Sequence, residues 1–200
     1  MAVGNGVAVQ FEFDQNMLAA IERKLGDMRS QAPRVFKLAL NDTARQAKSD
    51  LAKKAQETYA VKVGGFSKNV RLEAATTSTL EAWLKAKGSR LPITRKNFSV
   101  QGGKGPKGPY MKTLIKKSEG QHTWGSRAFH NVLGKSGHQG AAEYVGGGQP
   151  GRLHIKTLYT VSVPQMLGNE REVYGIVEPH IMENLQNNVN RHVARILNGG

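Results

Sequence analysis

The sequence predicts an α+β fold in which long N-terminal and C-terminal helices pack on a central, mainly antiparallel β-sheet that carries long glycine-rich basic loops. Apolar residues recur every three or four positions between Pro33 and Tyr59, and again between Ile181 and Ile196, as on one buried helix face. Between Val61 and Val163 they mostly alternate, as in half-buried strands. Because the chain has 200 residues and no internal repeat, we expect a single domain over residues 1–200.

The N-terminal part predicts a short strand followed by two helices. Residues 7–13 alternate, and Asp14 can cap a first helix that ends before Pro33. Pro33 then stands where a helix tolerates proline, in the first turn of the long helix. The apolar stripe of that helix is rich in alanine, which suits it to packing against a sheet or a neighbouring copy. A second stripe, of Arg34, Lys37, Arg45 and Lys48, is typical of a solvated face.

The middle of the chain predicts strands separated by loops. Pro92 indicates an edge strand, because proline cannot donate to a ladder. We expect residues 101–109 to form a flexible basic loop and residues 120–151 a Gly- and His-rich loop region. Two further extended segments precede Pro164, and the C-terminal helix ends at Gly199.

The composition favours a basic oligomer without disulfides. Only 38% of residues are hydrophobic and 6% aromatic, so contacts with other subunits would help the fold. The chain has no cysteine, no apolar run of membrane-spanning length and no signal-peptide pattern, so we expect no membrane contact and a protein that is made and used in a cytoplasm.

The net charge is +14, and the excess is concentrated between Ala82 and Ser118, where no acidic residue occurs. Such a block attracts phosphates or an acidic protein surface. Trp83, Phe98 and Tyr110 interleave with it, as in a nucleic-acid surface, although they could equally be the buried sides of strands. The candidate contact residues are Lys85, Lys87, Arg90, Arg95, Lys96, Lys104, Lys107, Lys112, Lys116 and Lys117.

No motif predicts catalysis, a metal site or a cofactor. Residues 134–136 resemble the end of a phosphate-binding loop, but Phe129 stands where the loop needs its first glycine. The histidines His122, His130 and His138 lack the spacing of metal ligands on one helix. Because the acidic residues are scattered, we expect that the protein is not an enzyme.

The second half of the chain contains four short motifs, at residues 126–129, 134–138, 152–159 and 162–166. In this order they resemble the minor tail protein Z family of long-tailed bacteriophages and prophages, and the resemblance extends back to about Pro33. Where the family usually has proline, this chain has His154. The motif residues are Arg152, Leu153, Ile155, Val163, Pro164 and Met166.

The resemblance implies a virion protein at the head-proximal end of the tail. It would form a ring, expected to be hexameric, that completes the tail and joins it to the head through tail-terminator or connector proteins. A ring needs contacts that close on themselves. We predict that these come from the alanine-rich helix and an edge strand, through Phe36, Leu40, Ala44, Ala47, Leu51 and Pro92.

The basic block then has two possible roles in such a ring. It could line the channel through which genomic DNA passes, or it could dock on an acidic neighbouring ring. The alternative from another class is a free basic DNA-binding protein, or a nuclease-associated subunit of a mobile element.

Overall fold

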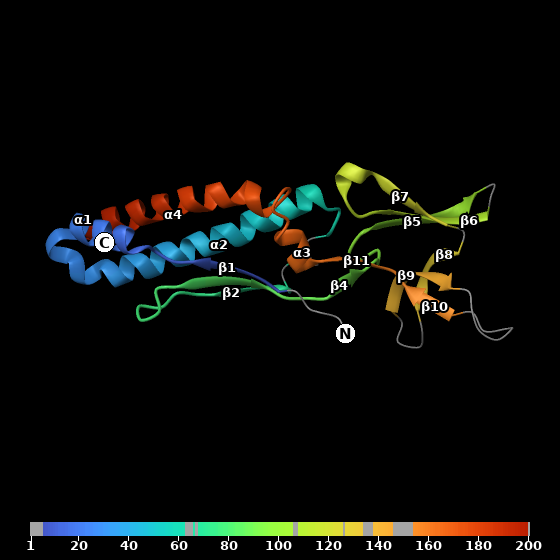
Figure 1. Ribbon diagram of the computed structural model, residues 1–200, viewed down its shortest axis with the longest axis horizontal. Coiled ribbons are helices and arrows are strands. Elements are labelled where there is room, and N and C mark those ends of the chain that lie inside the picture. The colour runs from blue at the N-terminus through green and yellow to red at the C-terminus, as the bar shows by residue number, and fades with distance from the viewer. Residues whose placement is uncertain are drawn as a thin grey trace.

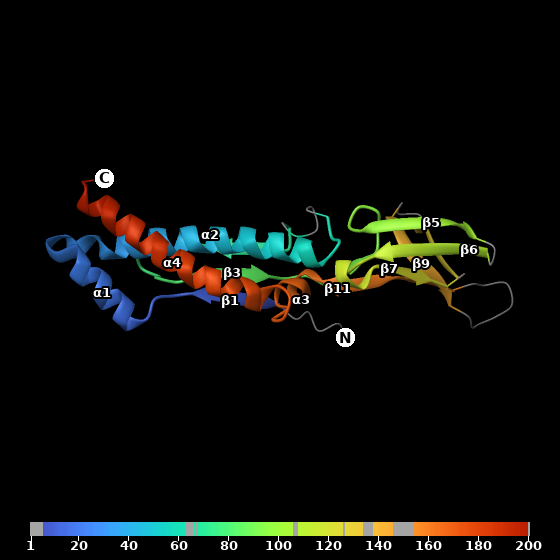
Figure 2. The same ribbon diagram turned by 90° about the horizontal axis from the view of Figure 1, so that it is seen from above.

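The computed structural model describes residues 6–62, 66, 68–105, 108–125, 127–133, 138–145 and 154–199. Helices gather at one end of an elongated molecule and small antiparallel sheets at the other (Figures 1 and 2). We call these ends the helical lobe and the β lobe. The chain is thus mixed helix and sheet, as predicted, but the strands in its described part form four small sheets and not one central sheet.

The helical lobe is a three-stranded antiparallel sheet covered by two long helices. The sheet has the order β1-β3-β2, and α2 lies across one of its faces with α4 antiparallel beside it (Figures 1 and 2). The elements of this lobe are β1 (Val7–Phe11), α1 (Gln15–Leu25), the 3-10 helix η1 (Gly26–Gln31), α2 (Ala32–Thr58), β2 (Val70–Glu73), β3 (Ala82–Ala86) and α4 (Tyr174–Leu197).

The β lobe consists of two three-stranded sheets, in the orders β5-β6-β7 and β10-β9-β8, and a strand pair, β4 and β11, leads into it. Its elements are β4 (Arg90–Pro92), β5 (Ser99–Gly105), β6 (Gly108–Leu114), the 3-10 helix η3 (Lys117–Glu119), β7 (Gln121–Trp124), β8 (Ala128–Leu133), β9 (His138–Val145), β10 (His154–Thr157) and β11 (Tyr159–Ser162). The short helix α3 (Val163–Leu167) returns the chain to the helical lobe.

Local sequence signals explain where the helices begin. The Asp14 side chain accepts a hydrogen bond from the Met17 amide at 2.7 Å and so caps α1. A capping box between Ser162 and Gln165 starts α3, a helix that the sequence did not predict. Near the start of α4, a side chain at Gly175 would clash with the Glu170 carbonyl oxygen, so this close approach needs glycine.

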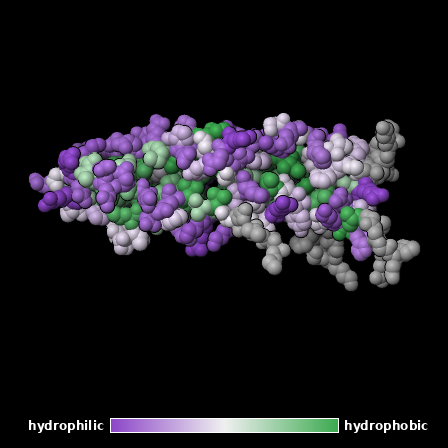
Figure 3. Space-filling view, viewed as in Figure 1, coloured by the Kyte–Doolittle hydropathy of each residue, from purple (hydrophilic) through white to green (hydrophobic). Residues whose placement is uncertain are grey.

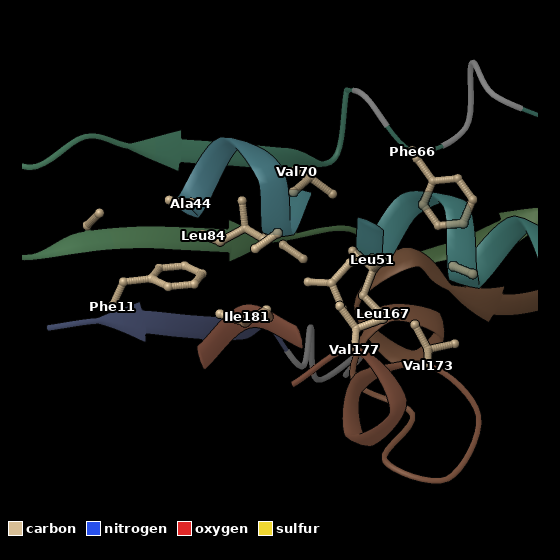
Figure 4. Close-up of a cluster of buried hydrophobic side chains, with 14 of the residues drawn as sticks. Phe11, Ala44, Leu51, Phe66, Val70, Leu84, Leu167, Val173, Val177 and Ile181 are labelled. Atoms are coloured by element: carbon tan, nitrogen blue, oxygen red, sulfur yellow. The ribbon is translucent and has the colours of Figure 1, made fainter. Parts of the chain in front are cut away.

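One continuous cluster of buried side chains runs through both lobes. In the helical lobe, Figure 4 shows residues of α2, the sheet and α4 meeting in it, among them Phe11, Leu51 and Ile181. Five of the six alanines of α2 are almost completely buried, which allows the helix to lie close to the sheet: Ala32, Ala39, Ala44, Ala47 and Ala55.

The structure contradicts the predicted subunit contact through α2. All five predicted residues of that helix are at most 2% exposed inside their own chain: Phe36, Leu40, Ala44, Ala47 and Leu51. An apolar stripe shows that a helix face is buried but does not show what buries it. Here the chain's own sheet and α4 cover it. The remaining interface residue, Pro92, is half-buried opposite Tyr159, and its role stays a prediction.

The two predicted loop regions are largely strands. Residues 101–105 and 108–109 continue the β5–β6 hairpin, whose register runs from Ser99 opposite Leu114 to Gly105 opposite Gly108. Much of the region from 120 to 151 forms β7, β8 and β9. Residues 106–107, 126, 134–137 and 146–151 lie outside the described chain. The prediction failed because glycines carry no side chain to show alternation, while extended backbone tolerates them when the partner strand is present.

Candidate interaction surfaces

The structure spreads the predicted basic block along the molecule. Lys85 lies on β3 and Lys87 directly after it, Arg90 is on β4, and Arg95 and Lys96 follow that strand. In the β lobe, Lys112 lies on β6, with Lys116 and Lys117 beyond its end. Lys107 lies outside the described residues, as does the side chain of Lys104. These residues therefore do not form one patch, and each must be judged by its neighbours.

Two of the lysines are engaged in ion pairs. Lys85 pairs with Glu73 and lies 5.4 Å from the centre of the half-buried Trp83 ring. Lys116 Nζ lies 2.8 Å from Glu172 Oε1 and 3.5 Å from Glu119 Oε1. Glu119 follows Lys116 by three residues, but Glu73 and Glu172 come from distant segments, so charge counting along the sequence could not reveal those two pairs.

The Lys116–Glu172 pair belongs to a joint between the two lobes. Glu172 Oε2 accepts a hydrogen bond from Asn169 Nδ2 at 2.8 Å, and the same amide donates to the Tyr59 hydroxyl at 2.9 Å. The backbone of Tyr59, at the end of α2, also forms a β-bridge with Lys116. The joint therefore connects the end of α2, the end of β6 and the segment between α3 and α4, and so helps to fix the lobes relative to one another.

The joint makes stability depend on pH. Its hydrogen bond and charge attraction lower the pKa of Glu172 and raise the pKa of Lys116. A lowered carboxyl pKa gives stability that is lost as the pH falls below about 4, and a raised lysine pKa gives stability that is lost only at strongly alkaline pH. We therefore expect Glu172→Gln to unfold at a lower temperature at pH 7 and to lose less stability than the native protein between pH 5 and pH 3.

Thermal unfolding followed by circular dichroism across that pH range measures this effect. Glu183→Gln is the control, because Glu183 is exposed and the one ion pair that it makes within the described ranges, with His180 at 3.9 Å, is loose. If the unfolding temperature of Glu172→Gln falls between pH 5 and pH 3 as steeply as that of the native protein, the ion pair does not stabilise the joint.

The outer face of the sheet β5-β6-β7 presents an aromatic ring beside a cation. Tyr110 is 37% exposed, and Lys112 Nζ lies 5.6 Å from the centre of its ring. Neighbouring strands place Gln101 and Thr123 opposite Lys112. A ring next to a lysine can stack on a base while the lysine contacts a phosphate. Of the three aromatic residues that the sequence singled out, Tyr110 fits this role, whereas Phe98 is completely buried.

The outer face of the other sheet is more apolar. The Phe129 and Tyr144 rings stack with their centres 4.6 Å apart, and Ile155, 53% exposed, lies opposite Tyr144. Arg127 is exposed next to Phe129. The sequence had shown Phe129 and Tyr144 only as parts of apolar patches, because their pairing depends on the β8–β9 register. Figure 3 shows such apolar patches between hydrophilic residues over both lobes.

The residues of the family motif have mainly structural positions. Val163, Pro164 and Met166 are buried in or next to the capping box of α3, and Ile155 lies on the exposed face described above. Arg152 and Leu153 lie outside the described residues.

The described histidines do not form a metal site. Burial and the nearby Arg95 lower the pKa of His130, and His122 meets the Trp124 ring edge-on with centres 4.7 Å apart. Within the described ranges, no three His, Asp or Glu side chains are arranged to hold a metal ion.

Comparison of the chain with protein-family models, curated proteins and solved structures finds no match. Among the described residues, no helix is both long enough and apolar enough to cross a membrane. The contacts of these surfaces are therefore the basis for a functional assignment, together with the resemblance noted in the sequence.

Proposed function

We propose that the protein is a structural, non-catalytic virion protein that completes the head-proximal end of a phage tail and joins it to the head. The observation that carries the proposal is the two-lobed form: a helical lobe and a β lobe lie at opposite ends of one elongated molecule (Figure 1). A protein that joins two assemblies needs two separate surfaces held at a fixed distance. The resemblance of the second half of the chain to the minor tail protein Z family indicates which class of joining protein this is, namely a phage tail protein.

The joint and the long helix support this role because they stiffen the molecule. At about 1.5 Å per residue, the 27 residues of α2 span about 40 Å. The Tyr59–Lys116 bridge holds the far end of this helix to the β lobe, and the Lys116–Glu172 pair ties the segment before α4 to the same place. A rigid spacer of this kind can transmit the position of one ring to the next.

A hexameric ring of copies now requires contacts other than the buried face of α2. In the described chain, β1 and β2 each pair only with β3, so each leaves one strand edge open. Open edges on opposite sides of a small sheet are suited to head-to-tail contacts, which can close into a ring. Tail-terminator or connector proteins would then lie above and below the ring, with genomic DNA in its channel.

Particle assembly tests the proposal directly. Tails made without the protein should lack a completed neck and fail to join heads, and adding the purified protein should restore joining. Electron microscopy of both preparations measures this. Normal necks in particles that lack the protein would contradict the proposal, as would turnover of a substrate by the purified chain.

A second candidate, free DNA binding, is favoured by the aromatic and basic faces of the β lobe. If these faces bind DNA, replacing both Lys112 and Arg127 by glutamine should lower the slope of log affinity against log salt by about 1.8, since each phosphate contact contributes about 0.9. Arg29 and Arg34 are exposed at the far end of the helical lobe, and the same double replacement there is the control.

The two roles of the β lobe predict different results in this experiment. Weaker DNA binding with normal head joining favours contact with DNA, and failed joining with unchanged DNA binding favours docking on a protein ring. Charge reversal at Lys116 is unsuitable for this purpose, because it would break the joint.

A further inference from the structure

An apolar groove opens in the helical lobe between α2 and the edge strand β2. Its volume is about 360 Å³. Its apolar lining comes from four parts of the chain: Leu51 and Ala52 of α2, Val70 and Leu84 of the sheet, Leu167 of α3, and Phe66. Figure 4 shows Leu51, Phe66, Val70, Leu84 and Leu167 around this region. The volume is at the lower end of the range for ligand sites, so one or two side chains would fill it.

The rim of the groove is basic. Arg45, Lys48 and Lys53 line it together with Ser49 and Gln56, and no acidic residue does. Lys48 donates a hydrogen bond to the Val70 carbonyl oxygen at 2.8 Å, which places its charge at the edge of β2. Among the described residues, Lys53 makes no ion pair and is exposed. The groove therefore offers an apolar floor beside three cations of α2. Arg45 is paired with Asp42 at 3.1 Å, whereas the charge of Lys53 is left for a ligand.

We propose that this groove docks an acidic segment of a partner protein. The segment inserts one or two large apolar side chains between α2 and β2, and its carboxylates lie against Arg45, Lys48 and Lys53. Other occupants fit less well. The acidic residues of this chain are scattered, so a second copy offers no acidic segment for the groove, and nucleic acid would leave the apolar floor uncovered. The inference deepens the proposed joining function, on which the identity of the partner as a neck protein rests.

The probe for the groove is the peptide acetyl-Glu-Asp-Leu-Phe-Glu-Asp-amide, titrated into the full-length protein by calorimetry at low salt. We expect saturable binding that weakens as salt is added, because exposed charge pairs are screened. Replacing the Leu-Phe pair of the peptide by Ser-Ser should weaken binding at least about 10-fold, since burying a large apolar side chain contributes at least that much. Replacing its four acidic residues by the corresponding amides should weaken binding by a similar factor at low salt.

Two variants locate the binding site. Ala52→Trp fills the groove from its α2 wall and should weaken peptide binding at least about 10-fold. Lys53→Glu should weaken it by about 5-fold at low salt. The matched controls are Ala74→Trp and Lys117→Glu, at exposed positions outside the groove, and both should bind the peptide within about twofold of the native protein. Far-UV circular dichroism confirms that each variant is folded.

Several outcomes would overturn the inference: no peptide binding, equal binding by Ala52→Trp, equal binding of a lysine-containing peptide, or binding of laurate without binding of the peptide. The last would assign the groove to a small amphiphilic anion. Head joining separates this inference from the proposed function. If Ala52→Trp loses the peptide but still joins heads and tails, the groove binds peptides outside that function. If no peptide binds but joining requires the protein, only the groove inference fails.

Discussion

Replacing Phe36 by alanine is expected to lower the free energy of unfolding by about 3–5 kcal/mol, the usual cost of truncating a buried phenylalanine. Phe36 is 2% exposed, and its ring centre lies 5.2 Å from that of Phe13, at a tilt of 50°. The Phe13 side chain comes from the segment between β1 and α1, so the lost contact joins α2 to the N-terminal part of the chain. The rigid backbones around it cannot collapse to fill the cavity.

Urea denaturation followed by circular dichroism measures this loss. Leu197→Ala is the control, because Leu197 is 47% exposed at the end of α4 and its truncation should cost no more than about 0.5 kcal/mol. The experiment also distinguishes the two interpretations of the α2 stripe. A subunit interface would give an unfolding midpoint that depends on protein concentration and a Phe36→Ala monomer as stable as the native monomer. If Phe36 is a core residue, the variant loses free energy of unfolding by the same amount at every protein concentration.

The helices could be predicted from the sequence because each carries its own signals. The long helix has an unbroken stripe from Phe36 to Tyr59 and a proline in its first turn, and the structure places it at Ala32–Thr58. The C-terminal helix follows the same logic, although Pro179 left its start uncertain. The structure extends it back to Tyr174. An interior proline removes one hydrogen bond and crowds the carbonyl group four residues back, so the sequence favoured a start at Pro179 over a helix that continues through it.

The partner of each element could not be predicted in the same way. Alternation in Ala128–Leu133 indicates a strand, but only the register with β9 brings Phe129 onto Tyr144. The ion pair of Lys116 with Glu172 likewise depends on how the lobes meet. The groove is the clearest case. Leu51 belongs to a stripe that the sequence shows plainly, but the opening beside it is lined by residues of α2, the sheet and α3, which lie far apart in the sequence.

Polar contacts between α2 and α4 lead to the second prediction. Asp42 Oδ2 accepts hydrogen bonds from Arg191 at 2.7 Å and from His192 Nε2 at 2.9 Å, and Oδ1 accepts one from Arg45 at 3.1 Å. One helical turn away, Asn188 donates to the Thr43 hydroxyl at 2.9 Å. His192 is 4% exposed, and its Nδ1 has no hydrogen-bond partner among the described residues. The carboxylate is thus the partner that satisfies this buried ring.

Asp42→Ala is expected to lower the free energy of unfolding by about 2–3 kcal/mol, because a buried group left without its hydrogen-bond partner costs about 1–3 kcal/mol and two arginine contacts are lost as well. Urea denaturation at pH 7 measures it. Glu57→Ala is the control: Glu57 pairs with Lys54 at 3.0 Å, but its side chain is 65% exposed, so we expect a loss below about 1 kcal/mol.

The double variant Asp42→Ala with His192→Leu identifies the cause of this loss. Once leucine replaces the imidazole, no polar ring remains to be satisfied, and removing the carboxylate should then cost much less than it does in the native background. Replacing both partners of a buried hydrogen bond by apolar groups can be nearly neutral. We therefore expect the double variant to be more stable than the sum of the two single losses predicts, by about 1–2 kcal/mol. Strict additivity would instead mean that Asp42 stabilises the protein through its arginine contacts, and that the Asp42–His192 pair does not fix the alignment of α4 on α2.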